Sequence, residues 1–446
     1  DTHKILLGLT IGLCVATVYG YLVLCNSDFI LNLTIQSNKI FGRIVYRSKQ
    51  WRHTLDENVT FTEFVKAQID LKKFVKNNAI KISVVDTGYI EMALNLWETS
   101  LKKFNVTNHV FVCISKESYK FLKRYGLTTY FYETKLNDEA SYFGTDVYKK
   151  KTVIKTILTE MILSTGYDTF IIDLDIVFLK DPFPLIKCDE CDLISQRDND
   201  VTVNTGFYLM KSTPSTVKLQ SKVINMSSVI NDNDQQLTNK ALQKVKMKTK
   251  LLPREEFCGG CDYFRTRQFA EDGRNTKCVI VHSTCQAGYD NKVYKFKEMN
   301  QWLVDTNGYY TSKTARYFTY TYSQCKDENC HYRILEFCLK LAKSIERNLI
   351  LPKFHCDDSN KCNFLRKFHD LKYIETNHSG AYREHSFLSH PKVPKVIKMS
   401  VSTISTIDIS PIFNQKVNIK DFIGSVVKEL KQRNLTQFSV IQAHFD

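Results

Sequence analysis

The sequence of 446 residues predicts an α/β protein built on a mostly parallel sheet. Two observations lead to this prediction. From Ile80 onward, short apolar runs of strand length alternate with amphipathic segments of helical length, as in sheets whose strands are joined by crossover helices. The apolar run Phe170–Ile172 is followed by polar groups, as at the end of a buried strand. Separately from the fold class, the stretch Ile5–Cys25, ahead of this region, contains no charged residue.

The uncharged span at the N-terminus has 21 residues, and a helix of about 20 apolar residues crosses a bilayer. We therefore predict a signal anchor over residues 1–25. The alternative is a cleavable signal peptide, because Val18-Tyr19-Gly20 loosely resembles a cleavage site with small residues. Residues 26–78 are polar and lack a sheet pattern, so we expect a stem, partly helical around Phe61–Val75.

Glycosylation sites and cysteines both indicate that the remaining chain lies in the lumen of the secretory pathway. Of the 14 cysteines, two lie in the apolar span, which leaves an even 12 for disulfides. The net charge of +15 comes from residues scattered along the chain. Nucleic acid is therefore not expected as a partner. Six N-x-S/T sequons are spread over the chain, at Asn32, Asn58, Asn105, Asn225, Asn377 and Asn434.

Two C-x-x-C pairs, Cys188 with Cys191 and Cys258 with Cys261, have two interpretations. They could hold zinc together, but 66 residues separate them, which is not a zinc-finger spacing. Disulfides are the favoured interpretation for a lumenal protein. The sequence does not give their connectivity.

The elements of the predicted sheet follow one another from residue 80. No glycine-rich dinucleotide fingerprint follows the first strand, which argues against an oxidoreductase of the Rossmann type. In order, we expect a strand at Ile80–Val85, a helix at Tyr89–Phe104, a strand at His109–Ile114, a helix at Lys116–Tyr125, a strand at Thr128–Tyr132 and a helix at Lys151–Ser164.

Two carboxylates follow the buried run, at Asp173 and Asp175. In an extended chain, residues two apart point to the same side, so these two side chains should lie together while Leu174 points back. Like charges so close need a cation between them, and Mg²⁺ or Mn²⁺ prefers such oxygen ligands. The alternative is a D-x-D triplet present by chance.

The run from Gly166 to Pro182, which includes Asp173-Leu174-Asp175, resembles the signature of nucleotide-diphospho-sugar transferases of the GT-A type. It is most similar to the plant cell-wall xylosyl- and arabinosyltransferases. The resemblance implies a Rossmann-like sheet in which the D-x-D binds Mn²⁺ (or Mg²⁺) and the diphosphate of a sugar nucleotide, with a UDP-sugar as donor. It also implies a type II Golgi membrane enzyme that transfers sugar, with retention, to a glycan or glycoprotein acceptor.

Later motifs extend this resemblance. Asn204 and Gly206 match an N-x-G-F motif beside the donor sugar, and Asp234-Gln235 match a pair near the reacting sugar. Gly206 would let the backbone approach closely. The alternatives are an ordinary turn into a strand for Asn204 and an acidic residue at a helix N-terminus for Asp234.

A histidine ends the predicted strand Val279–His282 and begins the spacing H-x5-G-x3-K, with Gly288 and Lys292. By resemblance, His282 completes the metal site, and Gly288 and Lys292 meet the diphosphate. An imidazole among carboxylates favours Mn²⁺ over Ca²⁺. The alternative is a histidine that serves the fold alone.

Lys155 and Thr87, which both precede the D-x-D in the sequence, complete the predicted site. Lys155, on the preceding helix, could reach the phosphates or the sugar, or could lie on a solvated face. Thr87, after the first strand, occupies the loop that contacts the nucleotide in the family. The alternative for Thr87 is a helix N-cap.

The resemblance covers roughly residues 80–305, and we expect a catalytic domain over residues 79–312, with a helix within Tyr294–Trp302. Residues 313–446 should form an α/β accessory lobe, with a helix and a short strand in Tyr332–Pro352. The alternative function is a lumenal protein on the same fold that binds glycan or sugar nucleotide without catalysis. A hydrolase is less favoured, because no acid/base pair of carboxylates stands out.

Overall fold

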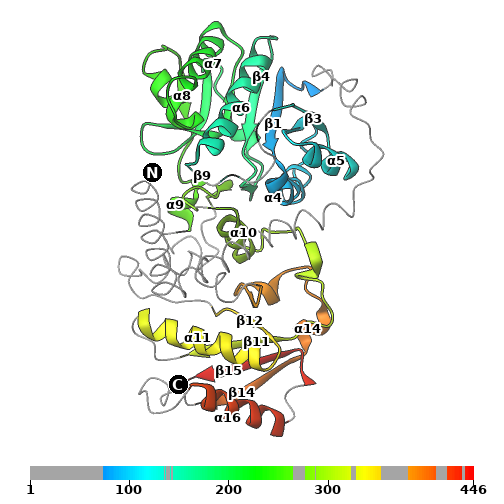
Figure 1. Cartoon of the computed structure of the whole chain (residues 1–446). Coiled ribbons are helices and arrows are strands. Elements are labelled where there is room, and N and C mark those ends of the chain that lie inside the picture. The colour runs from blue at the N-terminus through cyan, green and yellow to red at the C-terminus, as the bar shows by residue number, and fades with distance from the viewer. Residues whose placement is uncertain are drawn as a thin grey trace, which may run out of the picture. The chain divides into compact units, whose positions relative to one another are not determined.

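Figure 1 shows the computed structural model, which describes residues 74–134, 136, 141, 144–264, 277–286, 288–322, 328–352, 380–407, 419–433 and 437–445. The predicted anchor, most of the predicted stem and the sequons at Asn32, Asn58, Asn377 and Asn434 lie outside these residues. No helix in the described ranges is long and apolar enough to cross a membrane.

The described residues form a first sheet of seven strands in the order β3-β2-β1-β4-β7-β6-β8. Only β7 pairs antiparallel, with both of its neighbours, so the predicted α/β fold with a mostly parallel sheet is confirmed. The strands are β1 (Ala79–Val85), β2 (His109–Cys113), β3 (Thr129–Phe131), β4 (Asp168–Ile172), β6 (Leu193–Arg197), β7 (Val203–Met210) and β8 (Thr249–Leu251).

Helices connect these strands, as Figure 1 shows. Apolar side chains of α6, α7 and α8 pack in one core with those of the strands. The helix expected from Lys151 begins at Asp146 instead, because the Thr145 side chain accepts a hydrogen bond from the Tyr148 N–H and caps it. The helical segments are η2 (Thr87–Tyr89), α4 (Ile90–Leu96), η3 (Trp97–Leu101), α5 (Lys116–Arg124), α6 (Asp146–Leu163), α7 (Pro214–Ser227) and α8 (Asp234–Leu242).

A second, small sheet lies next to the end of β4. It consists of β5 (Ile176–Phe178), β10 (Ile280–His282) and β9 (Phe257–Gly259), followed by α9 (Gly260–Tyr263) and α10 (Tyr289–Glu298). The D-x-D lies in a turn between β4 and β5. The extended backbone expected at the D-x-D is therefore wrong, because the chain leaves the first sheet here and enters the second, but the two aspartates do lie together as expected.

The helix expected within Tyr294–Trp302 is shifted toward the N-terminus. It begins after Gly288, whose φ of 84° suits glycine, and it ends before Asn300, which has a left-handed φ of 55°. The backbone at these two positions, rather than the apolar pattern, sets the limits of α10.

The cysteine pairs form disulfides, and the zinc alternative is wrong. Cys188 bonds Cys191, whereas Cys258 and Cys261 bond Cys278 and Cys285 respectively. The second and third bonds join the β9–α9 segment to the two ends of β10. Within the described ranges, Cys113 and Cys338 are buried free thiols.

The C-terminal residues that the structure describes form a third sheet, in the order β13-β12-β11-β15-β14, with every pairing parallel. This agrees with the α/β lobe expected there, while the domain boundary at residue 312 stays a prediction. Its elements are β11 (Tyr317–Tyr322), α11 (Glu328–Ser344), β12 (Asn348–Ile350), β13 (Tyr382–Arg383), α14 (Lys395–Met399), β14 (Val401–Ile407), α16 (Ile419–Gln432) and β15 (Val440–Phe445).

Candidate active site

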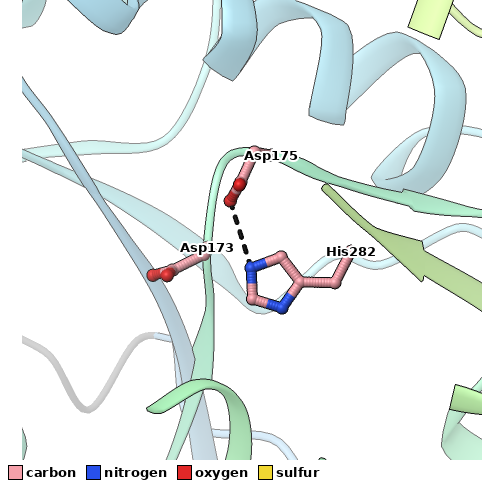
Figure 2. Close-up of side chains that lie close together, drawn as sticks. All are labelled: Asp173, Asp175 and His282. Carbon is pink, nitrogen blue, oxygen red and sulfur yellow. Dashed lines mark ion pairs between the residues drawn. The ribbon is translucent and has the colours of Figure 1, made fainter. Parts of the chain in front are cut away.

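Asp173, Asp175 and His282 come together where β4 ends. Each offers one ligand atom, and these atoms all lie within 4.8 Å of one another. Asp175 and His282 are largely buried, and Asp175 Oδ1 lies 3.3 Å from His282 Nε2. Figure 2 shows the carboxyl group of Asp175 facing the imidazole ring. The two aspartates and the histidine, 107 positions after Asp175, thus form one cluster.

Strand pairing explains why His282 meets Asp175. β5 and β10 pair antiparallel, with His282 opposite Ile176, the residue that follows the D-x-D. The N–H of Ser283 donates to the carbonyl of Asp175 at 2.9 Å. On the other side, the N–H of Asp173 donates to the Gly206 carbonyl at 2.7 Å. Backbone hydrogen bonds therefore hold both ends of the D-x-D turn.

Gly206 leaves the space that the cluster needs. A Cβ at this position would lie 2.4 Å from His282 Cε1 and 2.7 Å from an oxygen of Asp173. Any other residue would therefore push these two side chains aside. The predicted close approach of the backbone at Gly206 is a packing requirement of the cluster itself.

Gln196, at the end of β6, decides which nitrogen of His282 faces the aspartates. Its Nε2 donates to the carbonyl of Phe257 at 3.1 Å, which fixes the orientation of the amide. Its Oε1 then lies 2.8 Å from His282 Nδ1 and must accept from an Nδ1–H. In the neutral imidazole, the lone pair is then on Nε2, the nitrogen that faces Asp175. Sequence reasoning missed Gln196, although a polar residue ending a buried strand was a usable signal.

This arrangement fits a divalent cation. In the neutral tautomer that Gln196 selects, Nε2 and Asp175 Oδ1 are two acceptors facing each other at 3.3 Å, and a shared cation removes that conflict. Two carboxylates and an imidazole with its other nitrogen hydrogen-bonded form a common ligand set. Asp173, Asp175 and His282 are the residues that would hold the ion.

Lys155, on α6, joins two acidic groups of the site. Its Nζ lies 3.0 Å from Asp173 Oδ1 and 3.2 Å from Asp234 Oδ2, and it donates to the carbonyl of Thr205 at 3.2 Å. Burial opposes the charged ammonium, but the two carboxylates outweigh it and raise the pKa of Lys155. Burial also raises the pKa of Asp234. Lys155 is therefore a fixed cation of the site and not part of a solvated helix face.

Lys292, in the first turns of α10, pairs with the other aspartate. Its Nζ lies 2.7 Å from Asp175 Oδ2. Burial works against the charges of both groups. Their mutual attraction outweighs it, so the pKa of Lys292 is raised and the pKa of Asp175 is lowered. The structure thus brings Lys292 to the cluster, while its contact with the diphosphate stays a prediction.

The other predicted residues lie around this cluster and contact protein groups. Asn204 Oδ1 accepts from the Gly206 N–H at 2.8 Å, and Gln235 Oε1 accepts from the Thr205 N–H at 3.3 Å. Both amides therefore support the backbone of β7 beside the aspartates. Asp234 is the first residue of α8, as the alternative expected, while its place near the reacting sugar stays a prediction.

Thr87 lies farther along the same edge of the sheet, after β1. Its hydroxyl donates to Ser115 Oγ at 2.9 Å, and the N-cap position of η2 belongs to Asp86, so the capping alternative for Thr87 is wrong. Asp86 accepts from Lys151 at 2.9 Å, and both side chains are largely buried. Burial raises the pKa of Asp86. Sequence reasoning missed this ion pair, although an aspartate at the end of a buried strand was again the signal.

Residues 104–296 match the model of a family described as nucleotide-diphospho-sugar transferase. The chain is similar to a β-arabinofuranosyltransferase of Arabidopsis thaliana, with 21% identity over 263 residues, 52% of this chain and 49% of that protein. It is 22% identical over 297 residues to a UDP-galactose:fucoside α-3-galactosyltransferase of Dictyostelium discoideum, covering 52% of this chain and 44% of that protein.

A third relative is UDP-D-xylose:L-fucose α-1,3-D-xylosyltransferase 3 of Arabidopsis thaliana, 26% identical over 267 residues, which are 52% of this chain and 69% of that protein. The chain spans about half the length of the first two curated relatives.

Among solved structures, the chain is similar to a glycosyltransferase of Streptococcus pneumoniae, with 14% sequence identity and a TM-score of 0.36. The match covers 73% of this chain and 84% of that one. The predicted resemblance to the sugar-nucleotide transferases is confirmed: residues 104–296 match the family model, and the relatives named here are glycosyltransferases.

Proposed function

We propose that this protein is a metal-dependent glycosyltransferase that moves a sugar from a UDP-sugar to a glycan or glycoprotein acceptor. The observation that carries the proposal is the convergence of Asp173, Asp175 and His282 within the segment that matches the transferase family. The mixed oxygen and nitrogen donors favour Mn²⁺, with Mg²⁺ as the alternative.

The other residues of the site receive supporting roles in this proposal. A cation held by the cluster would neutralise charge on the departing diphosphate. Lys292 is assigned to the same diphosphate as a donor of hydrogen bonds, and Gly288 lets α10 begin close to it. Asp234 holds Lys155 in place rather than attacking the sugar, since its carboxylate is buried and already paired. Thr87 lies in the loop assigned to the nucleotide.

The names of the relatives support the choice of donor. Two of them use UDP-galactose or UDP-xylose and form α linkages to fucose or a fucoside. Both donors carry the sugar in the α configuration, so an α product means retention. We extend the UDP donor and the retaining outcome to this chain. The apolar span, the sequons and the disulfides support a lumenal Golgi domain behind a single membrane anchor.

The test is a screen of the purified protein for UDP release over a panel of UDP-sugars with Mn²⁺, with and without fucoside acceptors. Asp175→Ala removes one ligand and should lower turnover by about 10²- to 10³-fold, as for the loss of one preorganised electrostatic contact. Asp189→Ala, at an exposed position in the Cys188–Cys191 loop, is the control and should keep full activity.

Turnover that survives both the Asp175 substitution and a chelator would contradict metal dependence. Mn²⁺-dependent binding of UDP-sugars without hydrolysis or transfer would instead favour the alternative of a binding protein without catalysis.

A further inference from the structure

The carboxylate of Asp175 is shared between two functions. Its Oδ2 accepts a hydrogen bond from Lys292 at 2.7 Å, whereas its Oδ1 faces His282 at 3.3 Å. The ammonium therefore binds a carboxylate that is also assigned to the cation. The side chain of Asp175 is only 9% exposed, so little water screens the two positive charges from each other.

We propose that Lys292 competes with the divalent cation for Asp175, and that the diphosphate of the donor relieves this competition by drawing the ammonium away. Cation and donor then bind cooperatively, each raising the affinity for the other. This inference rests on the proposed function, which assigns the cation to Asp175 and the diphosphate to Lys292. It adds to that function a coupling between the two ligands: the cation binds tightly only when the donor is bound as well.

The two lysines of the site differ in a way that singles out Lys292. Lys155 is held by Asp173, by Asp234 and by the Thr205 carbonyl. Moving its ammonium would leave the buried carboxylate of Asp234 without a positively charged partner. Lys292 is bound to Asp175 and lies one turn after Gly288, at the start of α10. Its ammonium sits on a flexible stem of four carbons and can turn to a phosphate without moving the helix.

The charge of the Lys292 ammonium sets how the affinity for the cation should differ with and without a diphosphate. Without a diphosphate, a cation at Asp175 must displace the ammonium or tolerate its charge, so the affinity for the cation is low. A bound diphosphate supplies new acceptors for the ammonium, and the cation then has Asp175 to itself. By linkage, the factor by which UDP tightens cation binding equals the factor by which the cation tightens UDP binding.

The experiment is a titration of Mn²⁺ followed by electron paramagnetic resonance, with and without saturating UDP. It compares wild type, Lys292→Met and Lys295→Met. Lys295→Met is the matched control, because it removes the same charge from the same helix. Lys295 pairs with Glu298 and not with the cluster. Lys292→Gln is a second variant, in case the methionine disturbs folding.

Without UDP, both Lys292 variants should bind Mn²⁺ at least about 5-fold more tightly than wild type and Lys295→Met, the lower end of typical coupling between ligands. The tightening of Mn²⁺ binding by UDP should shrink by the same factor. Affinities in the Lys292 variants equal to those of wild type without UDP would overturn the inference. Absence of Mn²⁺ binding in wild type even with UDP would instead overturn the proposed metal site, and with it the proposed function.

Discussion

At the scale of single residues, one amide determines how His282 can serve as a ligand. Gln196 accepts from Nδ1 and is held by the Phe257 carbonyl, so Nε2 is the nitrogen that faces Asp175. Such partners of a ligating histidine fix its orientation and raise its basicity. Gln196 therefore belongs to the site, although it touches neither the donor nor the ion in our proposal.

Gln196→Leu should lower the affinity for Mn²⁺ in the presence of UDP by about 10- to 100-fold, the usual cost of losing such a partner. The same titration by electron paramagnetic resonance measures it. Gln196→Glu keeps an acceptor for Nδ1–H but loses the donor to the Phe257 carbonyl, so it should restore only part of the affinity. If the leucine variant bound Mn²⁺ as tightly as wild type, His282 would not depend on this hydrogen bond.

At the scale of elements, β10 is the strand that carries His282, and covalent bonds tie it to β9 and α9. Cys258 in β9 bonds Cys278 before β10, and Cys261 in α9 bonds Cys285 after it. The contact at Gly260 is so close that a Cβ there would lie 2.3 Å from the carbonyl of Thr284. This packing fixes the turn that follows His282.

Replacing both Cys261 and Cys285 by serine should therefore weaken Mn²⁺ binding as well as lower the free energy of unfolding. The stability cost is about 2–4 kcal/mol, typical for one disulfide. Serine at Cys188 and Cys191, which form a disulfide outside the cluster, is the control and should leave Mn²⁺ affinity unchanged. Equal Mn²⁺ affinities in the two double variants would show that the bond near His282 serves stability alone.

A buried histidine and a serine link three neighbouring strands of the first sheet through hydrogen bonds. His109 in β2 contacts the Ser83 hydroxyl in β1 at 2.8 Å, and that hydroxyl donates to the Ile172 carbonyl in β4. Burial, with a smaller effect of Lys81, lowers the pKa of His109 to about 3. The unfolded chain, with a histidine pKa of about 6.5, thus binds a proton that the folded protein excludes.

Because the folded pKa is depressed, His109 should make the protein less stable as the pH falls from about 6.5 toward 3, and should have no effect above that range. The slope is about 1.4 kcal/mol per pH unit for one proton. Urea unfolding of wild type and His109→Gln at pH 7 and pH 5 tests this. The variant should lose less stability on acidification, and equal losses in the two proteins would contradict the role of His109.

At the scale of the whole molecule, exposed N-glycosylation sequons relate to the proposal that the protein folds in the lumen of the secretory pathway. Asn105 and Asn225 are both exposed, Asn105 in the turn after η3 and Asn225 on α7. A lumenal protein would present both to the glycosylation machinery. Neither residue contacts the candidate active site, so glycans there are compatible with the proposed activity.

Treatment of the protein from a eukaryotic host with an enzyme that removes N-glycans should lower its apparent mass. Asn105→Gln should remove one glycan from the untreated protein and leave UDP-sugar turnover unchanged. A membrane-bound protein whose mass did not change on treatment would contradict the lumenal assignment.

The sequence by itself determined the class of the fold and the main residues of the candidate site. Alternating apolar runs are a local signal, and they placed strands such as Ile80–Val85 close to where they lie. Spacing and resemblance then selected Asp173, Asp175, His282 and Lys292, which the structure brings together. These signals work because each is contained in a short stretch of chain.

Only the tertiary structure decided how those residues are supported. Gln196 and His282 are 86 positions apart, and Lys292 and Asp175 are 117 apart, so no local pattern links them. The partners of Cys258 and Cys261, and the turn at the D-x-D, likewise depend on which strands pair. Strand pairing and side-chain contacts over such separations follow from packing the whole core, and a pattern read along the chain does not contain that information.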